Sequence, residues 1–166
     1  MQTPVPLDPI AGPVILSGSR AKATGVLARA SLQQGAALEV ALRAEADLGA
    51  LLSVRLANAA GEVLTVAFDA GSYPGFVVDR SGTRGFRHLY WVDRAIWAAP
   101  SGTTQTDMRI VVDRSSIELV GHGGEASVTM LQYFSSPPDR LEIVAERAAV
   151  ALPALMARSL RAASHG

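Results

Sequence analysis

The segment Met108–Val120 reads MRIVVDRSSIELV, and the interpretation of the whole chain starts from it. Residues 110–112 are β-branched, which restricts χ1 and suits the pleated surface of a strand. The polar residues 113–116 then interrupt the apolar pattern, and four polar side chains in a row cannot all enter a core without cost. The interruption therefore predicts a bulge, a turn between two strands, or a surface site.

A shorter version of this pattern occurs earlier, where residues 76–81 read FVVDRS. Asp79 and Arg80 follow an apolar run in the first segment, as Asp113 and Arg114 do in the second. The likeness predicts two similar local structures, although so short a match does not establish an internal repeat.

The composition of the chain is that of one globular domain. It has 166 residues, of which 49% are hydrophobic and 18% are charged. Lys and Arg together number 15, as do Asp and Glu, so the formal net charge is zero. Proteins that bind nucleic acid or a membrane surface carry a basic excess, and we therefore expect neither kind of partner.

Neither the cysteine content nor the N-terminus fixes a compartment. The absence of cysteine excludes disulfides and thiol chemistry only. The chain has no apolar run of transmembrane length and no signal peptide at its start, so it is expected to be cytoplasmic as written, or part of a larger exported protein. Four prolines in residues 1–13 predict an extended lead-in or linker, ahead of a domain at 14–162 and a tail at 163–166.

Alternation of apolar and polar residues recurs along the chain and predicts many short strands. The clearest hairpin joins residues 51–57 to residues 62–68. Residues 37–44 contain good helix formers but alternate with period two, and we interpret them as a strand, with a short helix as the alternative. Residues 17–19 (SGS) predict a turn. The whole pattern indicates an all-β sandwich or barrel.

Residues 109–119, with a glycine turn that carries Glu125 and then Thr129 and Phe134, resemble the C-terminal β-sandwich of glycoside hydrolase family 32. That family includes invertases, levanases and inulinases. The resemblance covers about residues 14–162 and implies an all-β fold, a two-sheet antiparallel β-sandwich.

Several positions depart from the family pattern. Residues 122–124 (HGG) replace an Asn-Asp-Gly turn, which puts any ligand contact from that turn in doubt, and Gln132 stands about where an Arg is expected. The largest departure concerns catalysis, because nothing in this sequence matches the motifs of the five-bladed catalytic propeller of the family. The chain thus looks like the accessory domain without its catalytic partner.

Three functions follow as hypotheses. The resemblance implies a non-catalytic accessory domain of a fructan- or sucrose-cleaving glycosidase, such as a β-fructofuranosidase or levanase, that supports a catalytic propeller domain or chain. A related carbohydrate-binding module recognises the fructosyl end of levan, which makes a free-standing fructan-binding module the second hypothesis. A structural or oligomerisation domain is the third. No catalytic residue and no cofactor are expected, and the three histidines lack the spacing of a metal site.

Sugar recognition combines carboxylates that accept hydrogen bonds, arginines that donate in a fixed fork, and aromatic rings that cover one sugar face. Trp91 and Trp97 lie six apart and share a strand face if that strand is continuous. A structural role competes with sugar binding, since the two Asp-Arg pairs could form salt bridges that hold strand register. The candidate carbohydrate-binding residues are Asp79, Arg80, Asp113, Arg114, Glu118, Tyr73 and Trp91, with Trp97 as a further aromatic.

Overall fold

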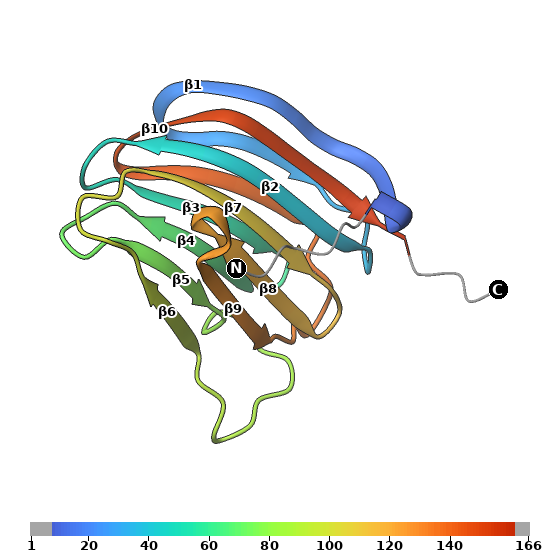
Figure 1. The fold of residues 1–166 in the computed structure, drawn as a ribbon. Coiled ribbons are helices and arrows are strands. Elements are labelled where there is room, and N and C mark those ends of the chain that lie inside the picture. The colour runs from blue at the N-terminus through green and yellow to red at the C-terminus, as the bar shows by residue number, and fades with distance from the viewer. Residues whose placement is uncertain (1–7, 162–166) are drawn as a thin grey trace.

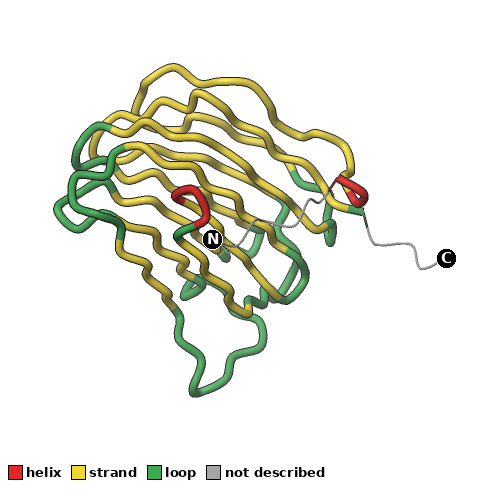
Figure 2. Tube along the Cα trace, viewed as in Figure 1, coloured by secondary structure: helices red, strands yellow, loops and turns green. Residues whose placement is uncertain are grey.

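The structure, a computed structural model, describes residues 8–161 and is built almost entirely of strands (Figures 1 and 2). Two short 3-10 helices, η1 (Asp8–Ile10) and η2 (His122–Gly124), are the helical elements of this described part. None of its helices has the length and apolarity needed to cross a membrane. The strands are β1 (Ala11–Ser31), β2 (Ala37–Ala46), β3 (Leu51–Ala57), β4 (Val63–Asp69), β5 (Gly75–Asp79), β6 (Arg94–Ala98), β7 (Gln105–Val112), β8 (Ser116–Gly121), β9 (Ala126–Leu131) and β10 (Arg140–Leu160).

The long antiparallel strands β1 and β10 belong to both layers of the fold. Residues 140–146 of β10 pair with β3, whereas residues 150–160 pair with β2. Two sheets therefore diverge from β10: a first sheet in the order β10-β3-β4-β5-β6 and a second sheet in the order β10-β2-β7-β8-β9. Figure 1 shows the two sheets curving toward each other, and their edge strands β6 and β9 come into contact. The fold is the predicted all-β, two-sheet antiparallel sandwich, closed nearly into a barrel.

Irregular positions in the two long strands allow them to pass from one sheet to the other. Between its two pairing regions β10 contains Arg147, whose φ of 68° lies in the left-handed region. The register between β1 and β10 shifts several times, as expected at β-bulges. One shift follows Gly18, whose φ is 107°. The turn predicted at residues 17–19 is therefore wrong. Within residues 8–161 β1 pairs only with β10, and an edge strand can bulge without leaving its sheet.

Other elements predicted from the sequence are present in the structure. Residues 37–44 form a strand within β2, and the predicted hairpin is β3 and β4. Of the three alternatives for the polar interruption at residues 113–116, the turn between two strands is correct, because it joins β7 to β8. β1 begins at Ala11, inside the predicted lead-in, while residues 1–7 of that lead-in and the tail at 163–166 lie outside the described residues.

The core fills the space between the sheets and explains the period-two pattern. In β3, for example, the alternate residues Leu52, Val54 and Leu56 belong to the core. An aromatic row crosses the first sheet, with ring centroids 5.3 Å apart for Phe68 and Phe76. Trp97 continues this row at 5.8 Å from Phe76 and packs against the core. The burial of large apolar side chains between two sheets is what stabilises this fold.

Candidate functional site

Asp79 and Asp113 fold the residues that follow them into the same kind of turn. The Oδ1 atom of Asp79 accepts hydrogen bonds from Ser81 N at 2.9 Å and Ser81 Oγ at 2.6 Å. The Oδ1 atom of Asp113 accepts from Ser115 N and Ser116 N, both at 2.8 Å. Burial would raise the pKa of each carboxyl, but these hydrogen bonds lower it. The predicted similarity of the two segments is confirmed as a pair of Asx turns.

The arginines that follow these aspartates occupy opposite environments. Arg80 is only 6% exposed, whereas Arg114 is exposed on the turn between β7 and β8. Arg80 Nε donates to Val92 O and Arg80 Nη1 donates to Leu131 O, both at 2.8 Å. Its guanidinium carbon also lies 5.2 Å from the centroid of the Trp91 ring. These contacts give Arg80 a structural position inside the protein and leave Arg114 as the arginine that faces solvent.

Asp79 forms a salt bridge with Arg94 of the neighbouring strand and not with Arg80. Asp79 Oδ2 accepts from Arg94 Nη2 at 2.6 Å and from Arg94 Nε at 3.1 Å, across the β5 and β6 pair. Because Arg94 is directly opposite Asp79 in the ladder, these two hydrogen bonds to one carboxylate oxygen join the end of β5 to the edge strand.

Trp91 lies in the loop of residues 80–93 between β5 and β6, so the strand that would place it beside Trp97 is not continuous. Its ring stacks on Tyr133 with a centroid distance of 5.7 Å and an interplanar angle of 16°. Phe86 meets it edge to face at 5.4 Å. The half-buried Trp91 therefore fastens loop 80–93 to the chain that follows β9.

Tyr73 and Glu118 are exposed at two other places. Tyr73 is in the loop between β4 and β5, where its side chain is 94% exposed. Glu118 lies on the outer face of β8, opposite Val111 and Thr129. The predicted sugar-binding residues are thus distributed over several surfaces and do not form one site.

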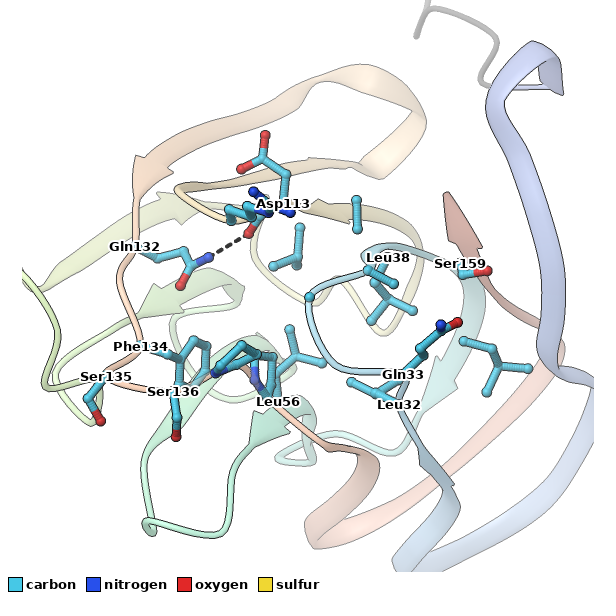
Figure 3. Close-up of a pocket in the computed structure, with 18 residues that line it drawn as sticks. Leu32, Gln33, Leu38, Leu56, Asp113, Gln132, Phe134, Ser135, Ser136 and Ser159 are labelled. Carbon is cyan, nitrogen blue, oxygen red and sulfur yellow. Dashed lines mark hydrogen bonds between the residues drawn. The ribbon is translucent and has the colours of Figure 1, made fainter. Parts of the chain in front are cut away.

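A pocket of about 360 Å³ opens at one end of the sandwich (Figure 3). It is bounded by the β1 to β2 loop, the β7 to β8 turn and the β9 to β10 loop. Of the residues predicted to bind sugar, Asp113 and Arg114 line this end pocket and the others do not. Its apolar wall consists mainly of Ile15, Leu32, Leu38, Leu56, Val112, Phe134, Pro137 and Pro138, and its polar side chains include Gln33, Gln132, Ser135, Ser136 and Ser159.

Gln132 lines the end pocket, and one polar atom of its buried side chain has no hydrogen-bond partner among the described residues. The residue is 2% exposed, and its Nε2 atom donates to Asp113 O at 2.7 Å. Its Oε1 atom is buried and has no hydrogen-bond partner among the described residues. Figure 3 shows the amide between Asp113 and Phe134, with its nitrogen directed toward Asp113. The sequence marked Gln132 only as a departure from an expected Arg, and that departure was the one signal that pointed to this position.

Glu62 ties the end pocket to the neighbouring loops. This buried carboxylate accepts hydrogen bonds from Asn58 Nδ2 at 2.6 Å, Ser135 Oγ at 2.6 Å and the backbone N–H groups of Arg84 and Ser135. Burial alone would raise the pKa of Glu62, but the hydrogen bonds from Ser135, Asn58 and Arg84 lower it to about 2. Glu62 is therefore an anion in the folded protein, and its hydrogen bonds join the β3 to β4 loop, loop 80–93 and the β9 to β10 loop.

Loop 80–93 and the adjacent β6 carry exposed apolar side chains. We define the loop surface as Phe86, Leu89, Tyr90, Val92 and Ile96, which are between 64% and 89% exposed. Figure 1 shows the loop between β5 and β6 projecting beyond the two sheets. Large apolar side chains gathered on one projecting segment are typical of an interaction surface. No group of three or more side chains suited to binding a metal is found within residues 8–161.

Residues 15–158 match the protein family described as "Glycosyl hydrolases family 32 C terminal". Solved structures with a similar fold include an exo-inulinase from Aspergillus awamori, with 20% identity and a TM-score of 0.75. A fructofuranosidase from Schwanniomyces occidentalis complexed with fructosylnystose has 16% sequence identity to this chain and a TM-score of 0.76. Fructan 1-exohydrolase IIa from Cichorium intybus has 12% identity and a TM-score of 0.74. At these identities the likeness concerns the fold.

The shared region is a minor part of each of those proteins. The alignment with the inulinase covers 95% of this chain but 31% of the inulinase chain. The alignments with the fructofuranosidase and the exohydrolase each cover 96% of this chain, but 36% and 38% of those two chains. This chain thus spans about a third of the length of the solved structures it resembles. The comparison with curated proteins gave no significant match.

Proposed function

Because the chain belongs to the family of C-terminal domains of family 32 glycoside hydrolases, we propose that it supports a catalytic propeller by docking against it through the loop surface. These residues correspond to the accessory, non-catalytic part of such enzymes and do not include the propeller. The observation that carries the proposal is the exposure of the five apolar side chains of the loop surface.

Two buried polar side chains, Arg80 and Glu62, hold loop 80–93 in place before any partner binds. Arg80 donates hydrogen bonds to the carbonyl oxygens of Val92, in the loop, and Leu131, in β9. Glu62 accepts a hydrogen bond from the N–H of Arg84, also in the loop. A surface that is ordered before binding loses less conformational freedom on association. Burial of its apolar area against a partner then contributes roughly 25 cal/mol for each Å² removed from water.

The substrate of the assembled protein is proposed from its structural relatives. The relatives include an exo-inulinase and a fructofuranosidase solved with fructosylnystose. We propose that the docked catalytic domain cleaves fructosyl-terminated sugars, and that this chain takes no direct part in the chemistry. The likeness in fold supports the family assignment, while the substrate class is an extension from those proteins.

The docking role can be tested with this chain and a family 32 catalytic domain encoded in the same genome. Analytical ultracentrifugation of the mixture should show a one-to-one complex. The substitutions Leu89→Glu and Tyr90→Glu should abolish the complex without changing the melting temperature of the free chain. Leu48→Glu is the matched control, because Leu48 is 71% exposed on the turn between β2 and β3. Complex formation that survives both loop substitutions would reject the loop surface as the docking site.

A second function, binding of a fructosyl end by the chain itself, is favoured by the end pocket. The pocket combines an aromatic wall at Phe134 with the polar groups of Asp113, Arg114 and Gln132, and such a mixture of apolar lining and few polar groups suits one small ligand. Isothermal titration with levan, inulin and fructose tests this function. Arg114→Ala, which changes an exposed side chain, should weaken binding while the fold is retained.

A further inference from the structure

We propose that the partner of the loop surface is acidic around an apolar centre, with carboxylates placed to pair with Arg84 and Arg87. This inference rests on the docking role proposed above and adds the chemistry of the surface that the catalytic propeller presents. It has a kinetic consequence, because opposite charges on two surfaces accelerate their association and make the association rate sensitive to salt.

The loop and the first residue of β6 carry an excess of positive charge. Residues 79–94 contain four arginines and two aspartates, so their formal excess is two positive charges in a chain whose net charge is zero. One aspartate is already neutralised, because Asp79 Oδ2 lies 2.6 Å from Arg94 Nη2. The excess therefore belongs to the remaining residues of loop 80–93.

Asp93 is the other acidic residue of this segment, and two arginines share it. Its Oδ1 atom lies 3.6 Å from Arg87 Nη2 and 4.0 Å from Arg80 Nε. Arg80 is buried, whereas Arg87 is exposed and also donates to Ser81 O at 2.8 Å. One carboxylate cannot neutralise two guanidinium groups, so Arg87 keeps part of its attraction for an anion outside the chain.

Arg84 has no acidic neighbour. Its side chain is exposed and forms no hydrogen bond or ion pair with any other residue that the structure describes. Its backbone is nevertheless fixed, because its N–H donates to the buried carboxylate of Glu62 at 2.5 Å. Arg84 thus presents a free guanidinium from an ordered position, two residues before Phe86 of the loop surface.

The arginines and the apolar side chains should have separate effects on docking. Arg84 and Arg87 flank Phe86 in the sequence, and Leu89 and Tyr90 follow them. Exposed charges at the rim of an interface mainly change the association rate, whereas buried apolar side chains at its centre mainly determine how long the complex lasts. The proposed partner surface therefore needs an apolar patch for affinity and carboxylates at its rim for recognition.

An anionic membrane is the other surface that a basic, aromatic loop could meet. Polybasic segments that bind such membranes contain clusters of about four to eight Lys or Arg residues. The excess of two charges in residues 79–94 is small by comparison, which favours a protein partner.

The first test measures association and dissociation rates with the family 32 catalytic domain at about 0.01 M and about 0.15 M salt, where the Debye length is about 30 Å and about 8 Å. Arg84→Glu should slow association about tenfold at the lower salt and less at the higher, while dissociation changes less than about twofold. Arg43→Glu is the matched control: Arg43 is exposed on β2, outside the loop, and the net charge changes equally. Equal slowing by both substitutions would overturn the inference.

The second test detects the partner's carboxylates directly. Lys22 is the single lysine of the sequence, so Arg84→Lys adds one amine to the loop. A water-soluble carbodiimide activates a carboxylate of the partner, and the amine displaces the activating group as a urea to form an amide. Mass spectrometry should find this link between residue 84 and an Asp or Glu of the catalytic domain, and Arg43→Lys should give none.

The outcomes separate this inference from the docking role. A complex that forms with the same rate at both salt concentrations and gives no link at residue 84 would overturn the inference and leave docking intact. No complex at either salt concentration would overturn both. Binding to phosphatidylcholine vesicles that contain phosphatidylserine, lost in Arg84→Glu and without binding to the catalytic domain, would assign the surface to a membrane instead.

Discussion

Arg80 Nη1 donates a hydrogen bond of 2.8 Å to the carbonyl oxygen of Leu131, 51 residues further along the chain. Arg80 directly follows β5 in the first sheet, and Leu131 ends β9 in the second, so the contact joins the two sheets where they come closest to closing. The same guanidinium donates to Val92 O and so holds the base of loop 80–93. One buried side chain thus connects the sandwich to the proposed docking surface.

Replacement of Arg80 by Met should lower the free energy of unfolding by about 2–3 kcal/mol, because two backbone carbonyl groups lose a charged donor. Urea denaturation measures this change. Arg94→Met is the control: Arg94 is 60% exposed in its ion pair with Asp79, and the loss of this pair should cost less than about 1 kcal/mol. Equal effects of the two substitutions would show that the hydrogen bonds of Arg80 between the two sheets do not stabilise the domain more than a surface ion pair does.

The stability of the domain should decrease as the pH falls from about 4.5 to about 2, in the range set by Glu62. The pKa of the Glu62 carboxyl is about 2 in the folded protein, against an ordinary value of 4.5 in the unfolded chain. As the pH falls, the unfolded chain therefore binds a proton at Glu62 before the folded protein does. Its stabilising effect is complete above pH 4.5 and is lost as the folded carboxylate becomes protonated. Denaturant unfolding between pH 6 and pH 2 should show this slope.

The variant Glu62→Gln should have a smaller slope between these pH values and a lower stability at pH 7. The slope should not vanish, because the pKa values of Asp79 and Asp113 are also lowered by hydrogen bonds in the folded state. A wild-type slope retained in full by Glu62→Gln would assign the acid sensitivity to those aspartates instead.

Gly85→Ala should displace loop 80–93 and weaken docking through the loop surface. A Cβ atom at Gly85 would lie 2.5 Å from Tyr133 O, which is also the acceptor of the Gly85 N–H at 3.0 Å. Limited proteolysis should cut the loop faster in this variant than in wild type. Gly102→Ala is the control, because Gly102 has a φ of 79° but no atom within 4 Å of the added methyl group, and it should cost about 1 kcal/mol without affecting the loop.

Glu39→Gln should destabilise the domain by about 2–4 kcal/mol, because it breaks a buried ionic cluster on the outer face of β2. Glu39 is 3% exposed, and its two oxygens accept from Arg109 Nε at 2.7 Å and Arg158 Nε at 2.5 Å. Glu118→Gln on the exposed face of β8 should change the stability by less than about 0.5 kcal/mol. Thermal unfolding of both variants makes the comparison, and a similar loss in each would contradict it.

Local pattern was sufficient to predict many of the strands, although not the continuous course of β1 through residues 17–19. Residues 37–44 alternate with period two, and they form a strand in spite of their helix-forming composition, because each sheet buries one face. Asp113 and the serines after it specify the turn between β7 and β8 through hydrogen bonds that span at most three residues. Contacts of such short range are encoded where they occur, so the sequence alone restricted residues 113–116 to a bulge, a turn or a surface site, and the structure has the turn.

The candidate site depended on contacts that no local pattern contains. Asp79-Arg80-Ser81 and Asp113-Arg114-Ser115 form the same turn, yet Arg80 is buried and Arg114 is exposed. The difference arises because the ends of β5 and β9 meet and offer Arg80 the carbonyl group of Leu131. Gln132 also depends on a contact between separate segments. Its Nε2 atom donates to Asp113 O in the turn between β7 and β8, and its Oε1 atom has no partner among the described residues. The sequence by itself thus determined most of the strands and the turn chemistry, whereas the packing of two sheets decided which polar side chains hold the protein together and which ones line the end pocket.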